Sequence, residues 1–184
     1  MSIKNISRKV TKILRHKLNT IKHNDEGFVL VNDLIKKIPE LNINILKEIV
    51  KTDNKNRFDL KEIKNFYYVR ANQGHSSGNL NDDKMLEILN EPIIGCYHGT
   101  YIDKVDLITK NGLSKMSRRH IHISESDDAI SGKRASSNVK IYIDMEKALN
   151  DGIKFYRSSN GVILTPGNKD GILDSKYFIK IEYL

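Results

Sequence analysis

The sequence predicts an α+β protein built from two small lobes. Residues 1–70 have mainly the spacing of amphipathic helices, whereas residues 93–184 consist mainly of short β runs separated by turn residues. Residues 76–83 between them are poor in apolar side chains and rich in turn formers, as in a linker. A chain of 184 residues can hold two small domains. We therefore predict a first lobe over residues 1–75, a linker over 76–92 and a second lobe over 93–184.

The first lobe opens with a predicted helix. Apolar residues recur at helical spacing from Ile3 to Leu18, with lysines and arginines between them. This helix ends in three basic residues, Arg15, His16 and Lys17.

A short β run at 28–31 comes next. Asn32 or Asp33 is then expected to cap a helix that Pro39 stops, and a further helix is predicted over 43–50. Residues 57–60 and 66–70 have the composition of two strands joined by a polar turn. Helix, strand, helix, helix and hairpin is the order of a winged helix. Basic residues of such a module commonly face nucleic acid.

The second lobe is predicted to be mostly β. One helix, over 102–110, interrupts its strands and has Asn111-Gly112 as its C-cap. The predicted strands are at 121–123, 139–143, 153–156, 162–164 and 178–181.

Composition limits the function. The excess of 31 Lys+Arg over 23 Asp+Glu gives a formal charge of +8, which attracts polyanions. No apolar run approaches the length of a membrane helix, and the N-terminal residues lack a secretory signal, so we expect a cytoplasmic protein. The single cysteine, Cys96, excludes an internal disulfide or a CxxC motif, and we interpret it as a packed, inert thiol.

Four polar clusters lie at the ends of predicted helices or strands. They are at residues 14–17, 69–76, 97–101 and 116–123, and each contains arginine or histidine. Arginine offers a rigid fork of donors matched to phosphate oxygens, and histidine adds a donor that titrates near neutral pH. Together they predict a phosphate site.

Each cluster also has a plain structural interpretation. Arg15 and His16 could be the solvated end of a basic helix, and the His98-Gly99-Thr100 triplet is weak evidence by itself. His120 and His122 are expected to lie two residues apart on one strand, so that their side chains share a face, which would also suit a zinc site. No cysteine or carboxylate lies at ligand spacing from them, so we predict no metal.

Several enzyme classes are disfavoured. Asp and Glu residues are scattered over turns and helix ends, and no pair of carboxylates suggests a general acid and base. The glycine-rich fingerprints of Rossmann and P-loop proteins are missing too. These features argue against ordinary hydrolytic and kinase chemistry.

Taken together and in order, six motifs resemble the NAD-dependent RNA 2'-phosphotransferase family, which removes the splice-junction 2'-phosphate from tRNA in eukaryotes. The motifs cover residues 14–17, 53–58, 69–76, 97–100, 118–124 and 155–162, so the resemblance spans nearly the whole chain. It implies a winged-helix RNA lobe joined to an ADP-ribosyltransferase-like β lobe, with the active site between them.

The resemblance also implies a reaction in which NAD is a co-substrate and no metal takes part. The RNA 2'-phosphate attacks C1'' of the nicotinamide ribose and expels nicotinamide, leaving an ADP-ribosylated RNA phosphate. The ribose 2''-hydroxyl then attacks that phosphate, releasing 2'-OH RNA and ADP-ribose 1'',2''-cyclic phosphate. The expected partners are NAD and a tRNA-like RNA, with no membrane, and the enzyme is expected to be a monomer.

The site residues follow by motif. The implied catalytic set is Arg15, His16, Arg70 and Arg118. The implied NAD-binding set is His98, Gly99, Thr100, His120 and His122. The implied RNA-binding set is Lys17, Gln73, His75 and Ser76. Arg118 is chosen over Arg119 because the family pattern is Arg-x-His ending at His120, and strand alternation would send Arg119 to the opposite face.

Two other functions stay open. One is an ADP-ribosyltransferase acting on phosphorylated nucleic acid ends or on protein; such enzymes usually use a catalytic glutamate, and residues 156–160 contain none. The other is a nonenzymatic winged-helix RNA-binding protein, which would leave the histidines of the second lobe without a role.

Overall fold

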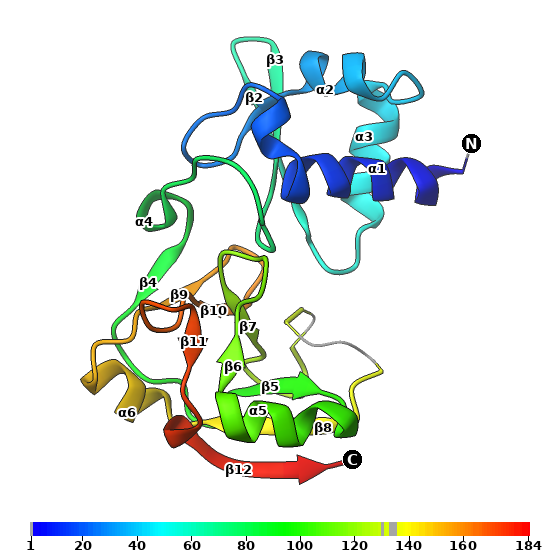
Figure 1. The fold of residues 1–184 in the computed structure, drawn as a ribbon. Helices are drawn as coiled ribbons and strands as arrows, with labels where there is room; N and C mark the ends of the chain where they lie inside the picture. Colours follow the sequence, from blue (N-terminus) through cyan, green and yellow to red (C-terminus); the bar gives the residue numbers. More distant parts are fainter. Residues whose placement is uncertain (1, 130, 133–135) are drawn as a thin grey trace. The chain divides into compact units, whose positions relative to one another are not determined.

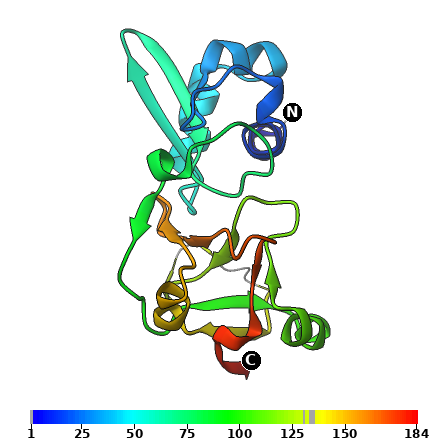
Figure 2. The same ribbon diagram turned by 60° about the vertical axis from the view of Figure 1, so that its left-hand side comes forward.

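The computed structural model describes residues 2–129, 131–132 and 136–184. The chain divides into two compact units, Met1–Met85 and Leu86–Leu184, each described by itself below. Helices and small antiparallel sheets alternate along the chain, which confirms the predicted mixture of α and β structure (Figures 1 and 2). Within the described residues, no helix has both the length and the apolar character needed to cross a bilayer.

The first unit begins with α1 (Ile3–His16), followed by a short 3-10 turn, η1 (Leu18–Thr20). Helical spacing places Ile6, Val10 and Leu14 on one face of α1, and all three are buried. That face packs against α3 (Ile43–Thr52) and β3 (Phe66–Ala71) (Figure 1).

Two short elements precede α3, namely β1 (Val29–Leu30) and α2 (Val31–Lys37). The predicted capping by Asn32 or Asp33 is wrong, because α2 begins earlier, with Leu30 at the N-cap position and no side-chain cap. Helix α2 stops just before Ile38, consistent with the restriction that Pro39 places on the residue before it.

The sheet of this unit has the order β1-β3-β2, and both pairings are antiparallel. Strands β2 (Phe58–Ile63) and β3 form a hairpin whose turn residues, Lys64 and Asn65, have φ of 49° and 66°. Two left-handed residues match the twist of a tight hairpin. The predicted order of helix, strand, helix, helix and hairpin is confirmed.

Part of the predicted linker is packed within the first unit. The Ser76 N–H donates to the Arg15 carbonyl at 2.8 Å, and the Leu18 N–H donates to Ser77 Oγ at 2.8 Å. Leu80 is buried, and residues 82–85 form a single helical turn, α4 (Asp82–Met85). The polar residues of this segment hold it against the end of α1.

The second unit contains two main sheets and a two-stranded ribbon. The first sheet has the order β4 (Glu87–Leu89), β9 (Phe155–Arg157), β10 (Ile163–Thr165), β7 (Ile121–Ile123). The second has the order β12 (Phe178–Tyr183), β8 (Val139–Ile143), β5 (Tyr97–Thr100). The ribbon pairs β11 (Ile172–Leu173) with β6 (Leu113–Ser114).

Helices of the second unit differ from the prediction in two ways. The predicted helix over 102–110 is divided into η2 (Ile102–Lys104) and α5 (Val105–Asn111), and Gly112 follows as C-cap at φ 80°. A second helix, α6 (Met145–Asn150), was not predicted; the Asp144 carboxylate caps it by accepting from the Lys147 N–H at 3.0 Å. A further 3-10 turn, η3, covers Ser175–Tyr177.

Gly167 has no room for a side chain. At φ +74° an added Cβ would lie 2.7 Å from the backbone of Ile172. We expect Gly167→Ala to lower the free energy of unfolding by about 2–4 kcal/mol, since backbone cannot move away as a flexible side chain can. Gly152→Ala is the matched control, because it has φ +82° but no atom within 4 Å. Equal losses for both variants in urea unfolding would contradict the steric argument.

Cys96 has the environment predicted for an inert thiol. It is fully buried, its Sγ donates to the Ile143 carbonyl at 3.9 Å, and burial raises its pKa from 9.0 to about 12. The thiol holds its proton more tightly in the folded protein than in the unfolded chain. The contribution of the buried, protonated thiol to the free energy of unfolding is therefore present below pH 9 and is lost as the pH rises toward 12. We expect a thiol reagent at pH 8 to label Cys96 at the rate of unfolding. Immediate labelling of the folded protein would contradict this prediction.

Candidate functional site

The C-terminal end of α1 carries two of the predicted catalytic residues. Arg15 is half-buried and lies against Gly74, where an added Cβ would be 3.3 Å from the Arg15 Cζ and Nε atoms. The His16 side chain shares a 2.9 Å hydrogen bond between its Nδ1 and Ser76 Oγ. Gly74 has φ +84°, so the loop approaches the guanidinium in a conformation that favours glycine. The structure thus brings together Arg15, His16 and Ser76 across about 60 positions of sequence.

Arg70 lies on β3, four residues before Gly74, and is 8% exposed. Its Nη1 and Nη2 atoms lie 3.5 Å from a Glu26 carboxylate oxygen and 3.4 Å from an Asp59 carboxylate oxygen. Its guanidinium carbon stands 4.6 Å above the Phe28 ring. Among the described residues, its buried Nε atom has no hydrogen-bond partner. The guanidinium is therefore held in position by two carboxylates and an aromatic ring.

The loop after β3 holds the predicted RNA-binding residues of this unit. Gln73 and His75 are buried, and the His75 ring lies beside Gly27, 3.7 Å from where a Cβ would stand there. Ser76 is half-buried, whereas Lys17 is exposed. The buried Gln73 and His75 side chains support the loop from within. Of the four predicted RNA-binding residues, Lys17 is the one whose side chain is exposed to a ligand.

A network beneath this loop explains the motif at residues 53–58. The Asp53 carboxylate pairs with the Arg57 guanidinium and accepts from the Arg57 N–H. The Arg57 carbonyl in turn accepts from the Asn72 N–H at 2.8 Å, and the Asn72 side chain donates to the Asn56 carbonyl at 2.7 Å. This motif fixes the start of the 72–77 loop.

In the second unit, β5 and β7 bring His98 and His122 together. The Tyr97 and Ser124 backbones exchange hydrogen bonds of 3.0 and 2.8 Å. The His98 Nδ1–H donates to the His122 carbonyl at 2.8 Å, which fixes the ring of His98. Both histidines are half-buried.

The residues next to them on the two strands are packed differently. Gly99 pairs with Lys140 of β8, and Thr100 is buried at the end of β5. His120 is buried with its ring edge on Tyr156, at 5.9 Å between centroids.

The alternation argument for Arg118 is wrong. β7 begins at Ile121, so Arg118, Arg119 and His120 lie in the preceding bend. Both arginines are half-buried there. Strand periodicity therefore does not assign Arg118 and Arg119 to opposite faces. It also does not place His120 on the same face as His122.

Two polar clusters beside these strands were missed by sequence reasoning. The Tyr97 hydroxyl donates to Asp127 at 2.8 Å, and Asp127 also pairs with Lys140 at 2.7 Å. Burial and the bond to Asp127 raise the pKa of Tyr97. In the second cluster, Arg157 on β9 donates to the Glu125 carboxylate at 2.9 Å, although the two lie 32 residues apart. Only the sheet pairing reveals that this glutamate lies beside the 156–160 segment.

Comparison with known proteins identifies the family. A model of the RNA 2'-phosphotransferase, Tpt1 / KptA family matches residues 2–167. The chain belongs to this family. Every predicted site residue of this RNA 2'-phosphotransferase family member lies within the matched range.

Three relatives of this family member show how far the similarity extends. tRNA 2'-phosphotransferase 1 of Danio rerio is 34% identical over 97% of this chain and 85% of its own length. A Fusobacterium nucleatum protein provisionally named an RNA 2'-phosphotransferase is 36% identical over 87% of this chain and 91% of its own. A Schizosaccharomyces pombe protein provisionally named a tRNA 2'-phosphotransferase is 41% identical over 96% of this chain, which spans half of that protein's length.

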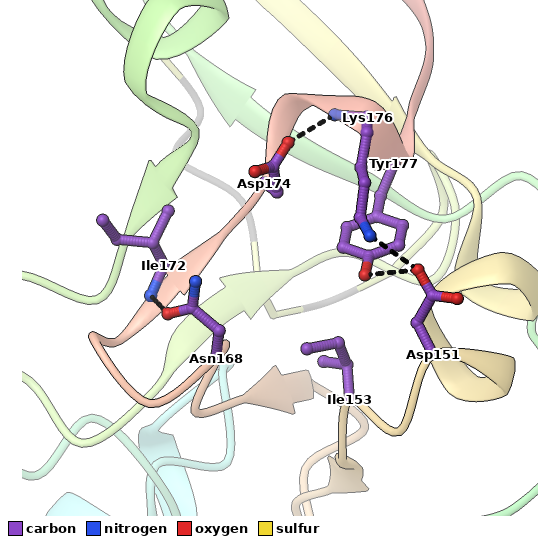
Figure 3. Close-up of a pocket in the computed structure, with 7 residues that line it drawn as sticks. All are labelled: Asp151, Ile153, Asn168, Ile172, Asp174, Lys176 and Tyr177. Atoms are coloured by element: carbon purple, nitrogen blue, oxygen red, sulfur yellow. Dashed lines mark hydrogen bonds and ion pairs between the residues drawn. The ribbon is translucent and has the colours of Figure 1, made fainter.

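A surface pocket of about 420 Å³ in this family member does not contain any predicted site residue. Figure 3 shows Lys176 and Tyr177 reaching one Asp151 carboxylate oxygen, each at 2.8 Å. The hydrogen bond from Lys176 holds the pKa of Asp151 below its ordinary value. Lys176 thus pairs with Asp151, while the Asp174 carboxylate accepts from the Lys176 N–H at 2.9 Å. In the part of the chain that the structure describes, no group of three or more His, Cys, Asp or Glu is arranged to hold a metal ion.

Proposed function

We propose that this protein removes an internal 2'-phosphate from RNA by transferring it to NAD. The 2'-phosphate attacks C1'' of the nicotinamide ribose, the C1''–N bond breaks and nicotinamide leaves. The 2''-hydroxyl of the resulting ADP-ribosylated RNA phosphate then attacks phosphorus. The products are RNA with a 2'-hydroxyl and ADP-ribose 1'',2''-cyclic phosphate. Membership of the RNA 2'-phosphotransferase family, over residues 2–167, is the observation that carries the proposal.

The geometry of the first unit suits a phosphate ligand. Arg15 and Arg70 are arginines held by their surroundings, one against Gly74 and the other by Glu26 and Asp59. A guanidinium that is already positioned loses little entropy when it binds a phosphate. The planar guanidinium of arginine matches the geometry of phosphate oxygens.

In this proposal His16 acts in the second step. Its Nδ1 is bound to Ser76, which fixes the ring and leaves Nε2 directed away from that contact. A protonated Nε2 supplies the proton that the RNA 2'-oxygen needs as the phosphorus–oxygen bond breaks. Ser76 is then a positioning residue for His16.

The second unit is proposed to bind NAD and the transferred phosphate. The His122 carbonyl orients the His98 ring, so that His98 offers NAD a fixed Nε2 atom. The glycine beside it allows a close backbone approach. Thr100, His120 and His122 complete the proposed NAD-binding set. Arg118 is proposed as the third arginine for the phosphate, which carries its highest charge in the second step.

One assay tests the function. The protein is incubated with NAD and an RNA that carries an internal 2'-phosphate, and nicotinamide, ADP-ribose 1'',2''-cyclic phosphate and RNA phosphate are measured. We expect all three to change in equal molar amounts. RNA binding without nicotinamide release would contradict any enzymatic function.

The assay also separates the alternative ADP-ribosyltransferase. Glu125 beside Arg157 is the observation that favours it, because such enzymes use a glutamate to polarise the ribose. Stable adduct on RNA ends or protein, lost in Glu125→Gln, would support the alternative and overturn transfer of the RNA phosphate.

A further inference from the structure

The positive charge of the protein is concentrated at its start. Residues 1–24 contain seven of the 31 lysines and arginines and none of the 23 acidic residues. Residues 25–184 therefore contain 24 basic and 23 acidic residues, so they are nearly neutral. The net charge of +8 therefore comes almost wholly from residues 1–24, which include α1.

Three of these basic residues form one stripe on α1. Lys4, Arg8 and Lys12 follow at four-residue steps, which places them on one face of the helix about 6 Å apart. All three are exposed, and Ile6, Val10 and Leu14 occupy the opposite, buried face. We refer to Lys4, Arg8 and Lys12 as the α1 stripe.

The α1 stripe leads along the helix to the phosphate-site residues of the same unit. Arg15 lies eleven residues after Lys4, close to three full turns, so it continues the same face about 16 Å away. His16 follows on the next position, bound to Ser76.

Helix stability does not explain the α1 stripe. Like charges at four-residue spacing repel, and a lysine in the first turn opposes the helix dipole, which no acidic residue there offsets. Some other exposed lysines do pair with carboxylates, as Lys9 does with Glu40 at 2.7 Å and Lys84 with Asp25 at 2.6 Å. Within the described residues, the α1 stripe takes part in no ion pair.

The chemistry of α1 favours a polyanion over a membrane. A helix that binds a bilayer inserts its apolar face. On the apolar face of α1, Ile6 is 3% exposed and Val10 and Leu14 are fully buried in their own unit, whereas Ile3 in the first turn is 38% exposed. Apart from Ile3, the exposed residues of α1 are polar or charged, and a row of cations with hydrated surroundings fits a phosphodiester backbone.

We propose that the α1 stripe binds the RNA backbone beside the 2'-phosphate and guides it toward Arg15 and His16. This inference rests on the proposed function for its substrate. It names a second contact surface, separate from the residues that act on the reacting phosphate. Its contribution is electrostatic and independent of base sequence.

The test replaces all three residues, as Lys4→Gln/Arg8→Gln/Lys12→Gln. The matched control, Lys110→Gln/Lys154→Gln/Lys169→Gln, removes the same charge from exposed positions of the second unit. Binding to a tRNA-sized RNA without a 2'-phosphate is measured by fluorescence anisotropy over a range of salt. The α1 variant is expected to bind about tenfold more weakly or worse at 0.1 M salt, with a slope of log Kd against log salt smaller by about 2 to 3.

A second measurement uses a trinucleotide with the 2'-phosphate, whose two backbone linkages cannot engage the whole stripe. We expect the α1 variant to keep wild-type kcat on it and to show a raised KM only for the long RNA. A salt slope equal to that of the control would overturn the inference. The inference would also be overturned if the α1 variant lost binding to phosphatidylserine and phosphatidylcholine vesicles while its RNA binding stayed unchanged. Because the anisotropy measurement needs no turnover, failure of the proposed function would be seen separately.

Discussion

His16→Ala is expected to slow the second step by about 10²- to 10⁴-fold, the range for loss of a general acid. The first step should keep close to its wild-type rate, because phosphate is already a competent nucleophile and needs no proton removed. ADP-ribosylated RNA should therefore accumulate in a single turnover. Quenched samples separated on a denaturing gel measure both steps at once.

The fold should survive this change, since the His16 side chain is exposed and lies outside the buried apolar face of α1. His23→Ala is the matched control, because His23 belongs to the same unit and bonds only locally, to the Ile21 carbonyl at 3.0 Å. An unaltered rate of cyclic phosphate formation in His16→Ala would refute the role of His16. A comparable loss in His23→Ala would show that the effect is structural.

Arg118→Ala is expected to reduce kcat/KM by about 10²- to 10³-fold, as when one donor to a developing charge is removed. Arg119→Ala is the control provided by the chain itself. Both arginines are half-buried in the bend before β7, so their substitution should cost similar stability. We expect kcat/KM of Arg119→Ala to stay close to wild type.

Comparison of these two variants decides whether Arg118 or Arg119 contacts the phosphate, which the backbone conformation of the bend does not settle. A large loss in Arg119→Ala with little effect in Arg118→Ala would exchange their roles. Small losses in both would remove this segment from the phosphate site.

The long helix α1 and several short strands were predictable from sequence, whereas α6, β6 and β11 were not. The spacing of Ile6, Val10 and Leu14 predicted α1 because three buried turns repeat the pattern. The six residues of α6 and the two-residue strands β6 and β11 are too short to show any period. Their positions come from pairing and packing with distant segments.

The site shows the same division. Motifs in the sequence predict which arginines and histidines form the proposed site, but they give no information on what holds these side chains. Gly74 against Arg15, Glu26 and Asp59 around Arg70, and Glu125 beside Arg157 are contacts between residues far apart in the chain. The 76–77 serines looked like linker by composition, yet they bind the end of α1. The composition of a segment shows how polar it is, but it does not reveal the hydrogen-bond partners of its residues.

The central claim is that the RNA 2'-phosphate itself moves to NAD. Its most direct test follows RNA labelled with ³²P at the internal 2'-phosphate, incubated with the protein and NAD. We predict that the label passes through ADP-ribosylated RNA and ends in ADP-ribose 1'',2''-cyclic phosphate, one label per nicotinamide released. Label released as inorganic phosphate, or retained on RNA while nicotinamide is released, would contradict the account.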